Sequence, residues 1–361
     1  MIFFRENEIR TYSFFEMLQT LYHGEMPLAD CLAARMTEYE PDLDRETAAR
    51  KVRNWKSDKN FPKNREELFK ICFALRLKEE EADELLGMTA ESGIHFRNPR
   101  EVIYAYCLRK EIDYPEACAM TERLWGKNLP TGGREYREYY RRQGSGESEE
   151  NLTGAFRRSF KKIQSEEELE AFLEDRREKF GLMHNTAYRK FRKMLDCLMN
   201  PQQENSVYPK EQSYSIRKLV NEYIRMGVPY RRKTGQYTWI QREIKKHWPS
   251  DRSIYEMYKR KMDVDRKTLL LLYLATEGEG LQEAEETGVQ EHQRKMNVML
   301  AECGMPVLND RNPFDSLVLQ VCRESSEEDY IGMQMERAVR SIFAEENAEK
   351  TTGGGMDKNE S

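Results

Sequence analysis

Apolar residues recur every three or four positions along most of the chain, which is the spacing of one face of an α-helix. Phe14, Phe15, Leu18 and Leu21 form such a face in the first periodic segment, and Pro27 follows as a helix-breaking residue. Similar segments, separated by short polar stretches, continue almost to the end of the sequence. The pattern therefore predicts an all-α protein.

The apolar segments contain an internal repeat, in which four landmarks occur twice in the same order. In the first copy the landmarks are the segment 13–27, the segment NREELFKICFAL from Asn64, Leu86, and the triplet Arg97-Asn98-Pro99. In the second copy they are the segment 215–229, the segment DRKTLLLLYLAT from Asp265, Leu300, and the triplet Arg311-Asn312-Pro313. The triplet begins eleven residues after the leucine in both copies. Such self-similarity predicts two related multi-helix modules, here joined by a central helical segment.

Each Arg-Asn-Pro triplet contains a signal for the start of a helix. Asparagine is a favoured N-cap residue, and proline suits the first helical position. Glu101 and Asp315 fall at the third helical position, where the acid of a capping box would lie. We therefore interpret the two triplets as helix starts and not as a ligand site.

Changes in composition divide the chain into five parts. Residues 1–126 form the first module, and residues 206–344 form the second module, which contains an acidic insertion. The central helical segment spans residues 152–205. Glycine-rich residues 127–151 predict a flexible linker, and the polar residues 345–361 predict a disordered tail.

Lysine and arginine are concentrated in two windows, although the net charge of the chain is -5. Residues 207–262 contain 14 Lys and Arg against 5 Asp and Glu, which gives a net charge of +9. Residues 45–76 contain 10 against 4, which gives +6. The two windows fall at matching places in the two modules. This distribution favours an anionic partner.

The motifs of several common enzyme classes are absent from the sequence. It contains no GxxxxGK[ST], GxGxxG, HExxH or GxSxG motif, so we expect neither an enzyme nor a bound cofactor. The seven cysteines include no CxxC pair, and the five histidines do not have the spacing of metal ligands. Cys72, Cys107 and Cys197 lie inside apolar helical stretches, so we expect them to be buried free thiols in a reducing cytoplasm. The sequence contains no run of 18 apolar residues, so we expect no transmembrane helix.

The first five helices of each module resemble the lambda-repressor-like (XRE-type) helix-turn-helix domain in their order and spacing. A two-helix unit is followed by a capped basic helix, a polar loop and an apolar helix that begins at Asn64 or Asp265. In this family the third helix enters the major groove of DNA and its neighbours contact phosphates. The chain departs from the family in having a long acidic segment, TEYEPDLD, in place of the tight turn between helices two and three. It also has a long insertion between the first two helices of the second module.

The resemblance implies that residues of the third helix of each module contact DNA. In the first module these residues are Arg45, Thr47, Arg50, Lys51 and Asn54. In the second module they are Arg252, Ser253, Tyr255, Glu256 and Lys259. Further basic residues of the +9 window are expected to contact phosphates: Arg231, Arg232, Lys233, Lys245 and Lys246.

Two hypotheses for the function follow from these patterns. The first is a soluble, cytoplasmic, prokaryotic regulator that binds double-stranded DNA, with the two modules acting as a covalent pseudo-dimer. The second is a helical scaffold or adaptor that keeps the helix-turn-helix fold and binds a protein. The two basic windows favour DNA, whereas the overall acidity favours a protein partner. Fold resemblance alone does not decide between them, because one fold serves many functions.

Overall fold

The computed structural model describes residues 13–57, 62, 64–89, 93–126, 152–199, 215–229, 237, 239–246, 248–277, 289–324 and 330–344. All secondary structure in these ranges is helical, and none of these residues forms a strand. The all-α fold predicted from the apolar spacing is therefore confirmed. The helices in these ranges are all too short or too polar to cross a membrane. The predicted linker at 127–151 and the predicted tail at 345–361 lie outside the described residues.

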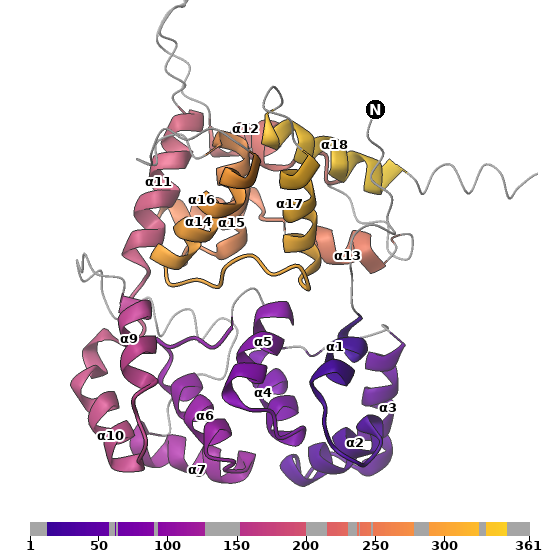
Figure 1. The fold of residues 1–361 in the computed structure, drawn as a ribbon, viewed down its shortest axis with the longest axis vertical. Coiled ribbons are helices and arrows are strands. Elements are labelled where there is room, and N and C mark those ends of the chain that lie inside the picture. The colour runs from indigo at the N-terminus through magenta and orange to yellow at the C-terminus, as the bar shows by residue number, and fades with distance from the viewer. Residues whose placement is uncertain are drawn as a thin grey trace, which may run out of the picture.

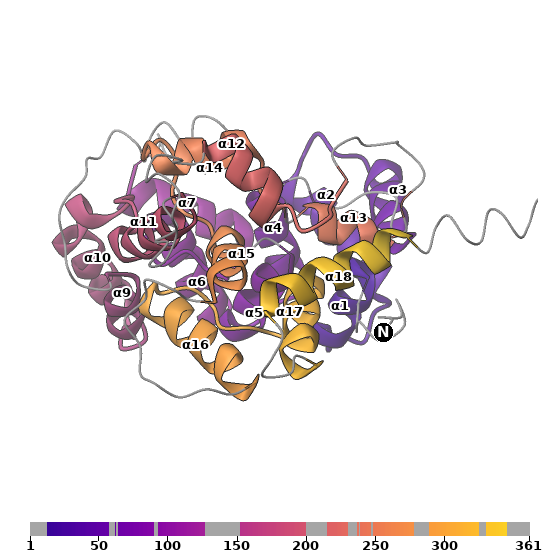
Figure 2. The same ribbon diagram turned by 90° about the horizontal axis from the view of Figure 1, so that it is seen from above.

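The helices form two lobes, one below the other in Figure 1. The first lobe contains α1 (Phe14–Leu21), α2 (Leu28–Tyr39), α3 (Arg45–Lys56), α4 (Arg65–Ala74), α5 (Glu79–Thr89), α6 (Pro99–Arg109), α7 (Tyr114–Leu124), α9 (Leu152–Phe160), α10 (Glu166–Asp175) and the short helix η2 (Arg177–Lys179). The second lobe contains α11 (Asn185–Met199), α12 (Ile216–Leu219), the π-helical turn η3 (Val220–Ile224), α13 (Trp239–Lys246), α14 (Asp251–Tyr258), α15 (Arg266–Thr276), α16 (Val289–Glu302), α17 (Pro313–Glu324) and α18 (Ile331–Ala344). Figure 2 shows the second lobe in front of the first when the molecule is seen from above.

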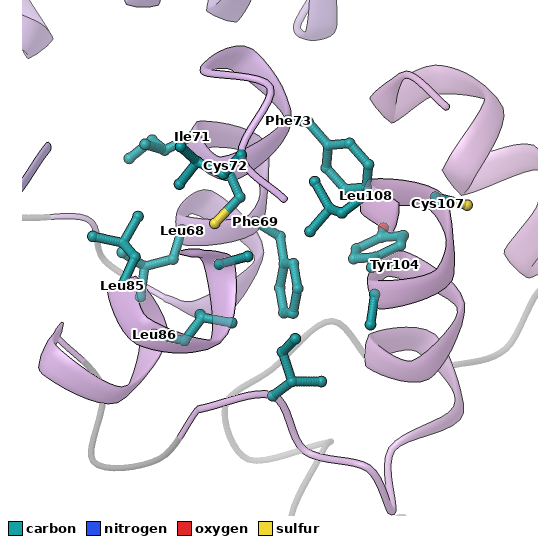
Figure 3. Close-up of a cluster of buried hydrophobic side chains, with 14 of the residues drawn as sticks. Leu68, Phe69, Ile71, Cys72, Phe73, Leu85, Leu86, Tyr104, Cys107 and Leu108 are labelled. Atoms are coloured by element: carbon teal, nitrogen blue, oxygen red, sulfur yellow. The ribbon is translucent and has the colours of Figure 1, made fainter. Parts of the chain in front are cut away.

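Each lobe has its own hydrophobic core. The first core contains buried side chains from α1 through α10, and the second contains buried side chains from α11 through α18. Figure 3 shows the centre of the first core, where α4 faces α5 and α6. There the rings of Phe69 and Tyr104 meet edge to face, with their centroids 5.2 Å apart. Such an arrangement aligns the positive edge of one ring with the negative face of the other.

The residues predicted as a central segment, 152–205, are divided between the two cores. Phe156 and Phe160 of α9 belong to the first core, whereas Phe191 and Leu195 of α11 belong to the second. Each helix buries its apolar face in the core of one lobe, so the two helices do not form a separate unit. The chain passes from one lobe to the other through residues 181–184.

A partly buried arginine–carboxylate pair joins the start of α4 to the start of α6. Arg65 donates hydrogen bonds to both carboxylate oxygens of Glu101, from Nε at 2.8 Å and from Nη2 at 2.6 Å. Glu101 also accepts a hydrogen bond from the backbone N–H of His95, at 2.8 Å. The backbone N–H of Asn98 donates instead to the His95 carbonyl, so the prediction that Glu101 closes a capping box is wrong.

The second lobe repeats this arrangement with an aspartate. Arg266, the first residue of α15, donates from Nη1 and Nη2 to the two carboxylate oxygens of Asp315, both at 2.7 Å. Asp315 accepts a further hydrogen bond from the backbone N–H of Asn309, six residues earlier, as Glu101 does from His95. The backbone N–H of Asn312 donates to the Asn309 carbonyl at 3.0 Å, so Asp315 does not close a capping box either. The repeat in the sequence thus extends to the hydrogen bonds that fix the two segments before α6 and α17.

Asn98 and Asn312 cap α6 and α17, as the triplets predicted. The Asn98 side chain accepts a hydrogen bond from the backbone N–H of Arg100 at 3.1 Å. The Asn312 side chain accepts from the backbone N–H groups of Phe314 and Asp315, at 3.0 and 3.2 Å. Each cap satisfies N–H groups that have no partner within their own helix.

Removing the carboxylate of the second pair should strongly destabilise the protein. We expect Asp315→Ala to lower the free energy of unfolding by about 3–5 kcal/mol, because it leaves the buried guanidinium of Arg266 without a counter-charge. Arg311→Ala removes an exposed arginine nearby and should cost less than about 1 kcal/mol. Urea denaturation of both variants measures the difference. Equal losses would show that the pair does not hold these helices.

Candidate nucleic-acid interface and interlobe cavity

Helix α3 is held in the first lobe by a cap and by one apolar face. The Asp44 side chain accepts a hydrogen bond from the backbone N–H of Thr47 at 2.8 Å, and Asp44 is the N-cap of the helix. Val52 and Trp55 are buried, and the Trp55 ring meets the Phe14 ring edge to face at 5.9 Å. Because one face is fixed in the core, the opposite face of α3 points to solvent.

The exposed face of α3 is basic. Arg45, Arg50 and Arg53 are exposed, and no acidic side chain of the described ranges forms an ion pair with them. Thr47 and Asn54, also expected to contact DNA, are partly exposed. The three arginines are therefore accessible to an anionic surface.

Lys51 differs from the other candidates on α3. Its ammonium group pairs with the carboxylate of Glu67 at the start of α4, and it lies over the Trp55 ring, 5.7 Å from the ring centroid. The structure thus places Lys51 in the contact between α3 and α4.

On α14, Ser253 is used within the helix itself. Ser250 and Ser253 form a reciprocal capping box, in which each backbone N–H donates to the other side chain, at 2.9 and 3.1 Å. The Ser253 hydroxyl also donates to the Ser250 carbonyl at 2.8 Å. The side chain predicted to contact DNA therefore stabilises the start of its own helix.

Three other candidates on α14 form an exposed stripe. Arg252, Tyr255 and Lys259 lie three and four residues apart, so they share one face of the helix. The Arg252 side chain is 85% exposed and pairs with Glu256 at 3.1 Å. Tyr255 is 46% exposed, with the Lys259 ammonium 5.7 Å from its ring centroid. The stripe lies in the second lobe, whereas α3 lies in the first (Figure 1).

The expected phosphate contacts fall mostly outside the described residues. This holds for Arg231, Arg232, Lys233 and the side chain of Lys246. Lys245 is described and partly buried, with its ammonium 4.9 Å from the ring centroid of Tyr237. Of this set, only Lys245 can thus be placed, and it packs against a neighbouring aromatic ring.

A cavity of about 480 Å³ lies where the two lobes meet. Its wall contains residues 93–98 of the first lobe, the connecting residues 181–184, and residues 261–266 and 304–306 of the second lobe. Residues 93–98 form the segment fixed by the first arginine–carboxylate pair, and residues 304–306 precede the segment fixed by the second. The cavity is therefore built on the repeated hydrogen-bond arrangement.

A chain of three side chains crosses this cavity wall from one lobe to the other. The Thr153 hydroxyl of α9 lies 3.0 Å from His184 Nε2, and His184 Nδ1 is hydrogen-bonded to Asp263 of the second lobe. Asp263 also accepts a hydrogen bond from the backbone N–H of His184 at 3.0 Å. A hydroxyl, an imidazole and a carboxylate follow in the order of a catalytic triad. Here the three side chains connect the first lobe to the second by hydrogen bonds.

The charges around Asp263 keep it ionised. Burial raises the pKa of the Asp263 carboxyl, but the neighbouring His184 and Arg97 outweigh burial and lower the pKa below its usual range. A carboxylate that stays negative holds the imidazole of His184 by its Nδ1 atom. This orientation leaves Nε2 directed at Thr153.

Arg97 lines the cavity without a hydrogen-bond partner for two of its nitrogens. The residue is only 7% exposed. Its Nε and Nη2 atoms are buried and donate no hydrogen bond to any acceptor in the described part of the protein. Burial lowers the pKa of Arg97, which the negative charge of Asp263 opposes. A buried cation without a bonded counter-charge costs several kcal/mol. The interpretation of the triplet as a helix start alone overlooked this side chain, because sequence spacing carries no information on burial by another lobe.

The matching arginine of the second triplet has a different environment. Arg311 is exposed, and its guanidinium pairs with Glu84 of α5 across the lobes. The two triplets have the same sequence and the same helix cap, yet only one arginine has a carboxylate partner. Arg311 is thus a natural reference for Arg97.

His95 faces the same cavity as a neutral imidazole. Burial, and next the charge of Arg65, lower the pKa of His95 from 6.5 to about 4, and Glu101 opposes the shift. The ring is therefore uncharged at neutral pH. It lines the cavity and remains partly exposed there.

The depressed pKa of His95 predicts a loss of stability in weak acid. Below pH 6.5 the unfolded chain binds a proton at His95 that the folded protein does not bind until about pH 4. Stability should therefore fall as the pH drops through this interval, and His95→Gln should flatten the fall. Urea midpoints measured from pH 7.5 to 4.5 test this, with His23→Gln at an exposed position as the control. Parallel profiles for wild type and His95→Gln would contradict it.

The cysteines and the side chains that could bind a metal ion can be placed within the described residues. All seven cysteines are free thiols. Cys72 and Cys107 are buried as predicted, and burial raises the pKa of both thiols to about 12. Cys197, also predicted to be buried, is only partly buried. Within the described ranges, no three His, Cys, Asp or Glu side chains are grouped to hold a metal ion.

Comparisons with known proteins add no family assignment. The chain matches no protein-family model, and no curated protein or solved structure is significantly similar to it. The XRE-type resemblance thus stays a prediction that depends on helix order and spacing.

Proposed function

We propose that the protein binds double-stranded DNA, with α3 in the position of the recognition helix of an XRE-type domain. The observation that carries the proposal is the exposed face of α3. Arg45, Arg50 and Arg53 project from a helix whose other face is fixed in the core, and no acid of the described ranges neutralises them. DNA recruits such cations because each phosphate contact releases condensed counterions.

The stripe on α14 supports a second contact within the same chain. Arg252 and Lys259 supply charge, and the exposed ring of Tyr255 between them can stack or pack against sugar and base. A chain that has one such helix in each lobe can contact DNA twice, as a dimer does, without a second copy. With two contacts the protein would neutralise more phosphates, and its affinity for DNA would fall more steeply with salt concentration.

A protein partner is the second candidate, and one surface feature favours it. Tyr330 and Met333, at the start of α18, are 68% and 53% exposed. Aromatic and methionine side chains are enriched in protein interfaces. The negative charge of the whole chain also suits a basic protein surface better than DNA.

A titration of duplex DNA at increasing salt distinguishes the two candidates. Wild type should bind a random duplex at about 50 mM salt, where surface charges are least screened. Arg50→Ala combined with Arg53→Ala should weaken binding on every sequence and reduce the log–log salt slope by about 2, since each lost phosphate contact removes about 0.9. Arg252→Ala should instead change the preference among sequences, by about 1–3 kcal/mol at one base pair if it reaches a base edge.

A matched control removes the same charge elsewhere in the first lobe. Lys161 and Lys162 are exposed and follow directly after α9. Helix α9 lies on the opposite side of the first lobe from α3 in both views (Figures 1 and 2). Their combined change to alanine should leave the salt slope unchanged. A wild-type titration that stays flat, or a control that weakens binding as much as the α3 variant, would remove the DNA proposal and leave the protein partner.

A further inference from the structure

Two cavities lined by described residues differ in how their charged side chains are paired. The second cavity lies within the first lobe, and each cation in its wall has an acidic partner: Lys51 pairs with Glu67, Lys70 with Glu40, and Arg100 with Glu66. Its charges are therefore satisfied by the protein itself. The interlobe cavity is different, because part of its positive charge has no acidic partner in the described part of the protein.

The arginines of the interlobe cavity show where the difference lies. Arg65, Arg157 and Arg266 each donate to a carboxylate of the protein, namely Glu101, Asp83 and Asp315. Arg97 is the remaining arginine of the wall, and no carboxylate bonds to it. Lys261 adds a further cation to the same wall, with no ion pair to an acid in the described ranges.

We propose that the interlobe cavity binds a small molecule with a phosphate or carboxylate group, and that Arg97 is the counter-charge for this group. An oxyanion in the cavity supplies the negative charge that the protein does not bring to Arg97. Guanidinium groups are the usual partners of both kinds of oxyanion. No feature of α3 or α14 enters the proposal, so it stands apart from DNA binding.

Asp263 does not take the place of this ligand. It is the acid whose charge acts on Arg97, but its oxygens are engaged elsewhere. One oxygen accepts from the backbone N–H groups of His184 and Val264, at 3.0 and 3.1 Å, and the other bonds to His184 Nδ1. The carboxylate therefore compensates Arg97 only at a distance.

The rest of the wall indicates the body of the ligand. Phe96, Met183, Met262, Met305 and Pro306 supply apolar surface, and His95 and Thr153 supply polar groups. A volume of about 480 Å³ suits a small organic molecule and is far larger than a bare phosphate ion needs. The ligand class is thus an anion with an apolar or aromatic body.

Thermal unfolding and calorimetric titration of the full chain test the proposal with simple probes. Phenyl phosphate or benzoate should raise Tm with increasing concentration, inorganic phosphate should do so less, and the uncharged benzyl alcohol should not. The stronger of the two aromatic anions identifies the charged group as phosphate or carboxylate. Equal shifts with benzyl alcohol, or none with either anion, would overturn the proposal.

Variants at the two matching arginines locate the binding. Arg97→Met should weaken binding of the preferred anion at least tenfold, while Arg311→Met should leave it unchanged. Arg50→Ala should also leave it unchanged, which separates the cavity from the basic face of α3. Anion binding that survives in Arg97→Met, or that Arg311→Met weakens equally, would contradict the assignment.

A second variant covers the case in which Arg97→Met does not fold. Lys261 is exposed at the cavity, so Lys261→Met should fold and should weaken anion binding several-fold. Unchanged affinity in this variant would then overturn the proposal.

Discussion

Two ion pairs with buried carboxylates, Arg65 with Glu101 and Arg266 with Asp315, connect helices that lie far apart in the sequence. Each carboxylate also holds a backbone N–H of the segment before its own helix. Burying an arginine and an acid is tolerable only when both are paired and bonded, so each pair requires its segment in one conformation. The position of α6 relative to α4, and of α17 relative to α15, follows from this requirement.

The cavity between the lobes is a consequence of the same constraint. The first pair fixes residues 93–98 as an ordered, non-helical segment, and this segment presents His95 and Arg97 to the second lobe. The connecting residues 181–184 then close the wall, with the carbonyl of Arg97 accepting a hydrogen bond from the backbone N–H of Gly181 at 3.0 Å. Polar groups buried at such a contact must find partners across it, which explains the bonds of His184 to Thr153 and Asp263.

Local features of the structure could be predicted from the sequence, whereas contacts between distant residues could not. The all-α fold and the caps at Asn98 and Asn312 follow from spacing and capping rules, which act within one helical turn. The same rules gave Glu101 the wrong bond, because its carboxylate bonds to the distant Arg65 and to the Asn98 side chain, and not to the Asn98 backbone N–H. Arg97 lines a cavity together with residues 181–184 and 261–266, which lie more than eighty residues away along the chain. No local pattern records that proximity.

The different surroundings of Arg97 and Arg311 have a consequence for stoichiometry. In a dimer of identical units, both arginines would have the same neighbours, so a central site would be symmetric or would occur twice. Within a single chain this restriction does not apply, because the two Arg-Asn-Pro segments can have different surroundings. One arginine then keeps an ion pair between the lobes, and the other faces a single asymmetric cavity. Because its two walls differ, the interlobe cavity would hold the ligand proposed for it in one defined orientation.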